Sequence, residues 1–455
     1  MTAFPPGAPG PSALPAAVLP DSAALAPDLS APRAALSPWR AFRRPGAFIG
    51  LVTLCFMVLA CLLTLPWTIG AITPAGYAYL PDAERPVTTR VERQFRGAER
   101  LPPTWFPHDP DQRRRADALA RSEAISRAAD ARGVSPESIR DSFAPTRAQI
   151  DAARPLHLLG TDVLGRDALA RTLAGGAISL LIGLAAAAIA VAVGTAYGTI
   201  SGYFGGTLDD AMMRIVDILY GLPYVLLIVL LAVASDALVD EFVSRAGAKE
   251  AFIRAAARTV AVERGWETTD RAISGLLSED KALYKDLQHR ADLDPAFAGE
   301  PLSPAQRTAL DLLALLIAIG ALSWLTLARV VRGQVLSLKS QPFMDAARVI
   351  GVPLPRIFRR HLLPNLAGPI VVYATLTVPQ AILQESFLSF LGIGVKPPIP
   401  SWGNLAADGL GELNTVHSNW WLLVFPCLLL ALTLLSLNLV GEGLREAIDP
   451  KRSAH

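Results

Sequence analysis

The chain alternates between long apolar runs and polar or charged segments. Six of the apolar runs are long enough to cross a hydrocarbon core of roughly 30 Å as helices. They lie at Phe48–Ile69, Leu173–Ile200, Ile215–Ala234, Leu310–Val330, Gly368–Leu391 and Trp420–Val440. The pattern predicts an all-α polytopic membrane protein with six transmembrane helices, the first of them within residues 39–70. An even number of spans places both termini on the same side of the membrane.

The segments between the apolar runs suggest the domain organisation. Residues 1–38 are rich in Ala, Pro and Ser, so we expect a disordered tail. Residues 156–234 and 308–455 form the expected membrane core. Two long polar segments, 71–155 and 235–307, interrupt the spans, and both contain stretches with helical patterning, such as Asp111–Ala131. We expect them to be extracytoplasmic and to pack against each other; an inert surface insertion is the alternative.

Composition and charge agree with a membrane class. The chain is 52% hydrophobic and only 18% charged, and its net charge of +2 hides a strong segregation of Lys and Arg. Three basic clusters fall on the same side if there are six spans, so that side is predicted to be cytoplasmic, together with both termini. The clusters precede the first span, separate the fourth from the fifth, and follow the last. No nucleic-acid partner is expected.

The polar segment from Ser340 to Asn365 is predicted to form two short helices joined at a glycine. Ser340 is the expected cap of the first helix, and Pro342 is expected in its first turn, where its missing N–H costs nothing. Asp345 lies near the N-terminal end, where a negative charge favours the helix dipole. The first helix should stop near Gly351. A second helix should start at Pro355, and Pro364 should end it before the next span.

The first of these helices carries small side chains that suggest a docking function. Ala346 and Ala347 leave one helical surface almost flat, and a flat surface outside the bilayer can enter a groove on another protein. The alternative interpretation is an ordinary cytoplasmic loop rich in Arg.

Within the spans, small and ionisable residues have separate interpretations. Gly194, Gly198 and Gly202 recur at intervals of four, which predicts close packing against a neighbouring helix. Gln384 and Glu385 lie at membrane depth, where an ionisable group is expensive unless it faces water or a partner. They are candidates for the translocation path; the alternative is that Glu385 lies at the outer interface in contact with water.

Patterns typical of catalysis are missing from the sequence. It contains no phosphate-binding G-x-x-x-x-G-K-[ST] loop and no H-E-x-x-H zinc pair. Its three cysteines, Cys55, Cys61 and Cys427, all lie in apolar runs, where they are expected to act as small hydrophobic residues. We therefore expect a chain that is not an enzyme, binds no cofactor or metal, and does not hydrolyse ATP by itself.

The polar loop resembles the EAA loop of membrane subunits of ABC importers. The resemblance lies in Asp345-Ala346-Ala347, followed after three residues by Gly351 and then by a basic helix ending at Pro364. Asp345 replaces the usual Glu and keeps its charge, and His361 stands where an apolar residue is common. The resemblance implies a coupling helix that sits in a cleft of an ATPase subunit. Its implied coupling residues are Asp345, Ala346, Ala347, Gly351, Arg359 and Pro364.

Four further motifs resemble those of the C-type permease subunit of dipeptide, oligopeptide and nickel importers. The first runs from His157 through Gly160-Thr161-Asp162 and Gly165-Arg166-Asp167 to Arg171. The others begin at Gly202, at Ser389 and at Asn438. The motifs occur in the family's order and, with the loop, cover roughly residues 155–235 and 308–452. The resemblance implies the type I ABC importer permease fold, with the segment 235–307 as an unusual insertion between the third and fourth spans.

The resemblance also implies a set of partners. They are a homologous B-type permease subunit, two ATPase subunits that hold ATP and Mg²⁺, and an extracytoplasmic binding protein, all assembled at a bacterial inner membrane. The implied function is import of dipeptides or oligopeptides. Nickel chelates or another small solute remain an alternative substrate. A membrane scaffold or receptor-like protein that docks a partner other than an ATPase remains an alternative function.

Overall fold

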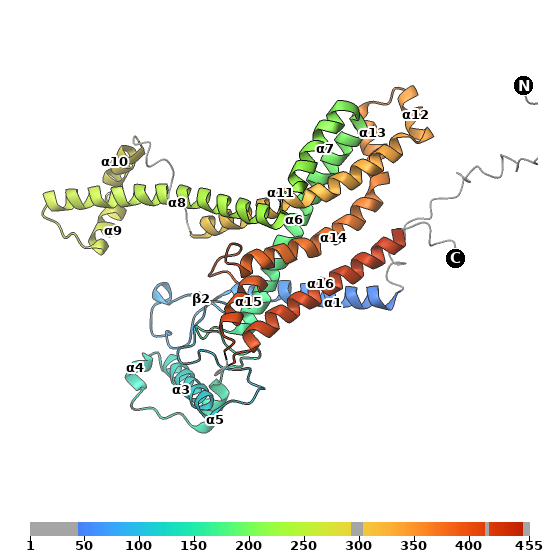
Figure 1. Ribbon diagram of the computed structural model, residues 1–455. Coiled ribbons are helices and arrows are strands. Elements are labelled where there is room, and N and C mark those ends of the chain that lie inside the picture. Colours follow the sequence, from blue (N-terminus) through green and yellow to red (C-terminus); the bar gives the residue numbers. More distant parts are fainter. Residues whose placement is uncertain (1–43, 293–303, 415–417, 449–455) are drawn as a thin grey trace, which may run out of the picture.

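Helices dominate the computed structural model, which describes residues 44–292, 304–414 and 418–448. The segment 1–38, expected to be disordered, lies outside the described residues. Five helical stretches are long and apolar enough to cross a membrane: Pro45–Ile69, Ala168–Phe204, Gln306–Lys339, Leu354–Phe390 and Trp421–Ala447. They correspond to five of the six expected spans and confirm an all-α polytopic membrane architecture (Figure 1).

The spanning stretches belong to the following helices. The first comprises α1 (Pro45–Leu63) and α2 (Leu65–Ile69); the others are α6 (Ala168–Phe204), α11 (Pro304–Lys339), α14 (Leu363–Phe390) with the turns that precede it, and α16 (Trp421–Ile448). A shorter helix, α15 (Trp402–Gly411), lies between α14 and α16 in the chain and packs against both.

The expected third span is not one continuous helix. Two helices, α7 (Gly206–Gly221) and α8 (Tyr224–Glu263), meet there at an angle of 93°. The break follows from Pro223, because a proline disfavours helical backbone at the residue before it. Leu222 is accordingly extended, with φ −82° and ψ 150°. The span expected at Ile215–Ala234 is therefore present only as a bent pair of helices, which together still pass as one broken span.

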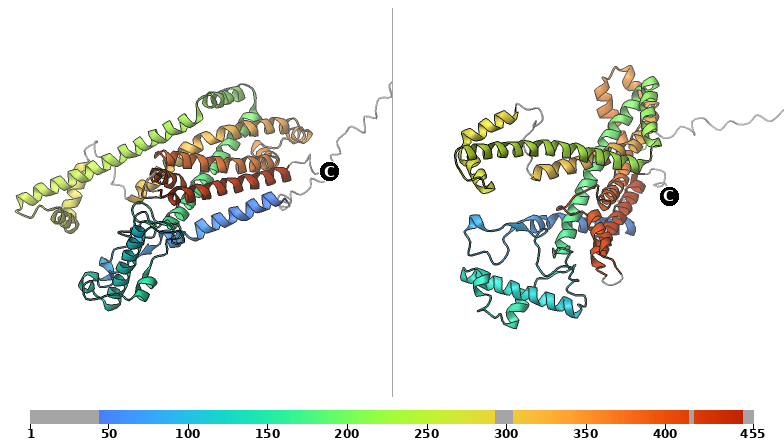
Figure 2. Two further views of the ribbon diagram at one scale, coloured as in Figure 1. Left: turned by 60° about the horizontal axis from the view of Figure 1, so that its bottom comes forward. Right: turned by 60° about the vertical axis from the view of Figure 1, so that its left-hand side comes forward.

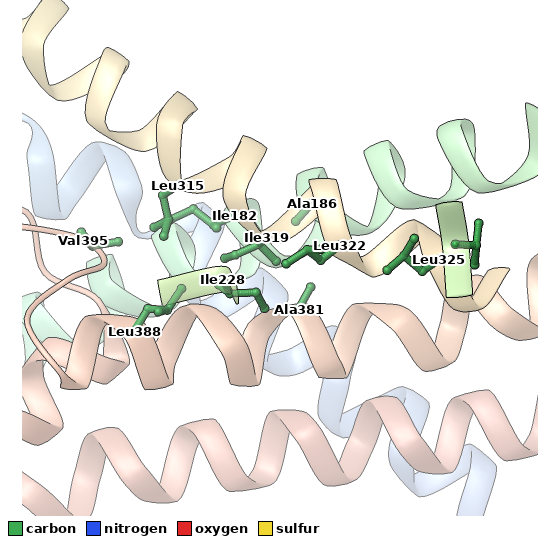
Figure 3. Packing of buried hydrophobic residues seen from close by; sticks show 11 residues of the cluster. Ile182, Ala186, Ile228, Leu315, Ile319, Leu322, Leu325, Ala381, Leu388 and Val395 are labelled. Atoms are coloured by element: carbon green, nitrogen blue, oxygen red, sulfur yellow. The ribbon is translucent and has the colours of Figure 1, made fainter. Parts of the chain in front are cut away.

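The membrane core is built around α6, which packs most extensively against α11. Side chains of α6, α8, α11 and α14 meet in one apolar cluster, seen from close by in Figure 3. Ile182 and Ala186 come from α6, and Ile319 and Leu322 from α11. The cluster therefore joins helices that are more than a hundred residues apart in the sequence.

The predicted glycine stripe forms the closest part of the α6–α11 contact. A Cβ atom added at Gly194, Gly198 or Gly202 would lie 2.8, 2.3 or 2.9 Å from a backbone carbonyl oxygen of α11. Real Cβ atoms do not approach other atoms so closely, so the helices can meet here only because these residues have no side chain. The expected close packing is confirmed.

The segment 71–155, called here the first outer segment, contains short elements around one longer helix. These are β1 (Ala71–Ile72), a 3-10 turn (Asp82–Glu84), β2 (Thr88–Thr89), α3 (Pro110–Arg132), α4 (Pro136–Ile139) and α5 (Arg147–Ala153). The helix expected at Asp111–Ala131 is confirmed as α3. Asp109 caps α3 and forms a capping box with Gln112, and Gly133 ends the helix with φ +64°.

The insertion forms an arm made of the outer half of α8 with α9 (Asp270–Glu279) and α10 (Lys281–Asp292). The 40 residues of α8 give a rod of about 60 Å. Ile253, Ala257, Ile273 and Leu287 belong to a core of the arm itself. The expected packing of the two outer segments against each other is not observed: their apolar clusters share no described residue, and they lie apart in all views (Figure 2).

The polar loop and the two described chain ends lie at the end of the bundle opposite the arm (Figure 2, left). An ion pair of 2.6 Å between Arg44 Nη1 and Glu446 Oε1 brings the start of α1 next to the end of α16. This arrangement agrees with the expectation that the loop and the ends of the membrane core share one side.

Candidate coupling loop

The first helix of the loop is α12, which spans Pro342–Val349. Pro342 and Asp345 lie in its first turn, as predicted, but the cap position is occupied by Gln341 rather than Ser340. The Ser340 hydroxyl instead donates a hydrogen bond of 3.0 Å to the carbonyl of Ser337, at the end of α11. The predicted serine cap was wrong because this hydroxyl is engaged by the preceding helix.

Gly351 ends α12, as the sequence predicted. Its φ of +74° lies in the left-handed region that residues with a Cβ rarely adopt. The N–H groups of Gly351 and Val352 donate to the carbonyls of Arg348 and Ala347, both at 3.0 Å, which satisfies the carbonyls at the helix end. A Cβ at Gly351 would meet nothing within 4 Å, so the backbone conformation, and not space, requires glycine here.

The two alanines of α12 face in opposite directions. Ala347 is only 5% exposed and is buried together with Met344, whereas Ala346 and Asp345 are exposed. Met344 belongs to an apolar cluster with Val331 of α11 and with residues of the second half of the loop and α14. The flat surface expected from both alanines is therefore divided: Ala347 anchors the helix, and Ala346 lies on its outer face.

Two apolar residues that the sequence interpretation missed dominate the outer end of α12. Val349 is 88% and Ile350 78% exposed. Together with Ala346 they give the end of the helix an apolar outer surface next to the Gly351 turn. The available signal was two consecutive branched residues just before a helix-ending glycine, at a place where a solvent-exposed turn is usually polar.

The second half of the loop differs from the prediction. A short helix, α13 (Leu354–Ile357), passes through a π-helical turn (Phe358–Leu362) directly into α14. Pro364 does not end this helix but lies in the first turn of α14, where its missing N–H is tolerated. In a regular helix its ring would clash with the carbonyl of Arg360, and the wider π turn lies at that point. The loop thus continues into the membrane span without a break.

Basic side chains line the outside of this π turn. Arg356, Arg359 and Arg360 are exposed, and none of them forms an ion pair with a described residue. Arg359 also lines a mainly apolar groove of about 680 Å³ between α6 and α14. His361, which stands where the family commonly has an apolar residue, stacks on Phe343 with ring centroids 6.4 Å apart and so ties the two halves of the loop together.

The loop is also held to the ends of α6 and α11 that lie beside it. The ring of Tyr203, at the end of α6, lies 5.0 Å from that of Phe358, and the guanidinium of Arg348 lies 5.9 Å from the same tyrosine ring. Arg332 of α11 holds Asp209 of α7 through two hydrogen bonds of 2.6 Å. Contacts therefore join the loop to α6, and α11 to α7.

The two residues expected in the translocation path lie in the other half of α14. Glu385 is 0% exposed; it accepts a hydrogen bond of 2.7 Å from the hydroxyl of Ser389 and a longer one from Ser386. The alternative of a water-exposed carboxylate at the interface was therefore wrong. Gln384 is half-buried. The fold does not bring either residue near the loop, and their role in a path stays a prediction.

The motif before α6 forms a second polar centre, at the end of the bundle opposite the loop (Figure 2). Asp162 accepts hydrogen bonds from the Arg166 side chain at 2.7 Å and from two backbone N–H groups. Its own carbonyl accepts from the backbone N–H of Arg100 at 2.9 Å, and the N–H of Leu101 donates to the Thr161 hydroxyl at 2.8 Å. This motif therefore fastens the first outer segment to the membrane core.

The exposed loop thus lies between two spans, and the motif before α6 forms the polar centre at the opposite end. Most of this membrane core matches a known family. Binding-protein-dependent transport system inner membrane components match residues 194–454. The chain belongs to this family. It is therefore a multi-pass permease of a binding-protein-dependent transport system, and the resemblance seen in the sequence is confirmed.

Several permeases are similar to this one over 295 residues, or 65% of the present chain. The oligopeptide transport system permease protein OppC of Haemophilus influenzae is 38% identical over 70% of its own length, and OppC of Escherichia coli is 39% identical over 72%. The dipeptide transport system permease protein DppC of Bacillus subtilis is 34% identical over 69%. All three carry the C designation expected from the motifs.

Proposed function

We propose that this permease forms half of the translocation pathway of an ABC importer for dipeptides or oligopeptides in a bacterial inner membrane. The other half is a homologous B-type permease. Two ATPase subunits bind ATP and Mg²⁺ on the cytoplasmic side, where both termini of the permease also lie, and a binding protein delivers the substrate from outside. The permease itself catalyses no reaction and binds no cofactor.

The observation that carries this proposal is the outer surface of α12. Ala346, Val349 and Ile350 are exposed outside the spanning stretches, where an uncovered apolar surface marks a protein contact. Burial of such side chains contributes about 25 cal/mol per Å² of apolar area, which favours docking in a cleft of an ATPase. The relatives are named as oligopeptide and dipeptide permeases, which supports a peptide as substrate.

The contacts of the loop suggest how ATP drives transport. Closure of the ATPase pair moves α12 as a rigid body, since Met344 anchors it to the same apolar cluster as α11 and the start of α14, and Ala347 of the same helix is buried. The movement then reaches α6 through its close packing against α11. Alternating access follows if the two permeases turn against each other in this way, and ATP hydrolysis resets them.

The test is to change the docking surface without changing the fold. In a Val349→Asp/Ile350→Asp double variant we expect the ATPase subunits to be lost from the purified complex, since central apolar contacts each contribute about 2 kcal/mol or more to binding. Uptake of a labelled peptide into proteoliposomes that contain ATP should fall with the loss of these subunits.

Val262→Asp is the matched control, because Val262 is also an exposed apolar residue, at 65%, but lies on the arm. This variant should keep both the ATPase subunits and the uptake activity. Equal recovery of ATPase subunits with the double variant and the wild type would refute the docking role of α12. A complex that retains a partner other than an ATPase would favour a scaffold instead.

A further inference from the structure

The first outer segment contains a cavity that the coupling function does not use. It has a volume of about 320 Å³ and lies between the stretch preceding α3, α3 itself and the stretch following α5. Leu101, Phe106 and Leu119 contribute an apolar part of its wall. Volumes of about 300 to 1,000 Å³ are typical of ligand sites, so this cavity suits a small ligand.

The remaining wall is basic. Arg113, Arg154, His108 and His157 line the cavity, and its lining contains no Asp or Glu. The charge of Arg154 is partly compensated because its guanidinium is paired with Asp117. Arg113, in contrast, forms no ion pair with any residue in the described part of the chain. The cavity therefore presents a positive charge that this chain does not neutralise.

The two histidines add polar atoms to the same wall. His108 Nδ1 lies 2.8 Å from the carbonyl oxygen of Phe106. Because a carbonyl can only accept, this nitrogen carries the ring proton. His157 is buried, and its Nε2 atom has no hydrogen-bond partner among the residues that the structure describes. The Nδ1 atom of the same ring lies 3.4 Å from Asp167 Oδ2. Buried polar atoms are rarely left unsatisfied, so the wall of this cavity lacks a polar partner at His157 Nε2 as well as a negative charge at Arg113.

We propose that this cavity is a binding site for a carboxylate that is attached to a small apolar group. The carboxylate would pair with Arg113 and the apolar group would pack against Leu101, Phe106 and Leu119. A free acid and the C-terminal residue of a peptide share this chemistry. The peptide as the source rests on the proposed transport function, whereas the site itself does not.

The experiment uses the full-length protein in lipid nanodiscs and saturation-transfer NMR, which detects weak binding. The probes are N-acetyl-leucine, its uncharged amide N-acetyl-leucinamide, and the peptide Gly-Gly-Leu. We expect saturable binding of N-acetyl-leucine at about millimolar concentration, the range accessible to so small a ligand. The amide should bind about tenfold more weakly, because it lacks the charge-assisted hydrogen bond.

A matched pair of variants locates the site. Arg113→Gln should weaken the binding of N-acetyl-leucine about tenfold. Arg114→Gln removes the same charge from the next residue of α3, which does not line the cavity, and should leave binding unchanged. Binding of Gly-Gly-Leu with the same dependence on Arg113 would identify a peptide end as a ligand; binding of N-acetyl-leucine alone would restrict the site to free acids.

The proposal is overturned if N-acetyl-leucine and its amide bind equally, if neither binds, or if the two arginine variants behave alike. Peptide uptake by proteoliposomes that contain the whole transport complex with the same variants separates this result from the proposed function. Normal ATP-driven uptake without carboxylate binding would remove the site and leave the importer, whereas carboxylate binding that depends on Arg113 without uptake would support the site and remove the importer.

Discussion

Two regions of the permease are held in place in opposite ways. One is the pair of helices α6 and α11, and the other is the arm of α8, α9 and α10. In the first region, three glycines of α6 let its backbone lie directly against that of α11, although the two helices are far apart in the sequence. The arm has an apolar core of its own and joins the bundle through the long helix α8 and the segment before α11. Tightly packed regions transmit displacements, whereas separately cored units can change independently. We therefore expect coupling to depend on the α6–α11 contact and not on the arm.

The largest effect on coupling is expected when the loop is detached from the α6–α11 pair. Gly351→Pro forces a negative φ on a residue at φ +74° and removes the N–H that bonds Arg348. Such a change costs about 3 kcal/mol or more, equivalent to a loss of more than about a hundredfold in the native loop conformation. Peptide uptake and stimulation of ATPase activity should both disappear, while membrane insertion continues.

Gly351→Asn is the control for this prediction, since Asn tolerates the left-handed conformation better than other residues with a side chain. It should retain a substantial part of the uptake. If the proline variant still couples ATP hydrolysis to transport, the Gly351 turn is not needed for coupling.

A smaller but more specific effect is expected from Gly198→Ala. The added Cβ would lie 2.3 Å from the carbonyl oxygen of Ala328, so α6 and α11 would have to separate. Overpacking of this kind costs about 1 to 3 kcal/mol. We expect a lower thermal unfolding midpoint of the purified complex and a reduced uptake rate.

Gly333→Ala supplies the matched comparison on α11, because a Cβ at Gly333 meets nothing within 4 Å. This substitution should be neutral or slightly stabilising, since Ala favours a helix over Gly by about 1 kcal/mol. Equal effects of the two substitutions would mean that the close approach at Gly198 is unimportant.

An ion pair attaches the first outer segment to the chain that follows α15, and its loss should have an intermediate effect. Arg100 donates two hydrogen bonds to Glu412, at 2.6 and 3.0 Å, and this contact lowers the pKa of the Glu412 carboxyl below its ordinary value. A lowered pKa in the folded state stabilises the fold above the unfolded-state pKa of about 4.3, and this contribution is lost as the pH falls through the folded pKa.

Glu412→Gln should therefore reduce the free energy of unfolding by about 0.5 to 1 kcal/mol at pH 7, the modest size reflecting the exposure of Arg100. The difference from the wild type should shrink as thermal unfolding is followed to lower pH, because the contribution is lost as the pH falls through the folded-state pKa. Glu84→Gln, on the same segment, is the control, since Glu84 forms no ion pair in the described part of the chain, and it should leave the free energy of unfolding at pH 7 nearly unchanged. A difference that persists at low pH would show that charge is not its cause.

Removal of the arm should have the smallest effect. With residues 240–303 replaced by a flexible Gly/Ser linker, we expect the unfolding midpoint of the membrane core and the ATPase stimulation to change little, because the two cores share no described residue. Loss of ATPase stimulation in this variant would overturn the comparison and assign the arm a part in coupling.

Local patterns in the sequence predicted where α12 begins and ends, but not which residue occupies its cap position or how the chain continues past Pro364. The position of Gly351 and the start at Pro342 follow from backbone restrictions of single residues, and both were confirmed. Ser340, in contrast, had a competing carbonyl available in α11, and Pro364 could be accommodated by a π turn. Both errors arose where a neighbouring helix offered an alternative to the local rule.

Burial was the other property beyond local reasoning. Val349 and Ile350 looked like helix residues in the sequence, and they are exposed because no element in the described part of the chain covers them. Glu385 looked like a pathway or interface residue, and only the tertiary structure shows that it is fully buried and that its carboxylate accepts hydrogen bonds from two serines of α14. The bend before α8 was readable from Pro223, but its 93° angle was not.

The sequence by itself determined the membrane class, the position of five spans, the family motifs and the spacing of the three glycines, because length, hydropathy and backbone restrictions act within a few residues of chain. The tertiary structure decided that the glycines face α11, that Ala347 points inward while Ala346 points outward, and that the arm has a separate core. These outcomes depend on which distant helix lies against each surface, and the free energy of burial is fixed only when that partner is in place.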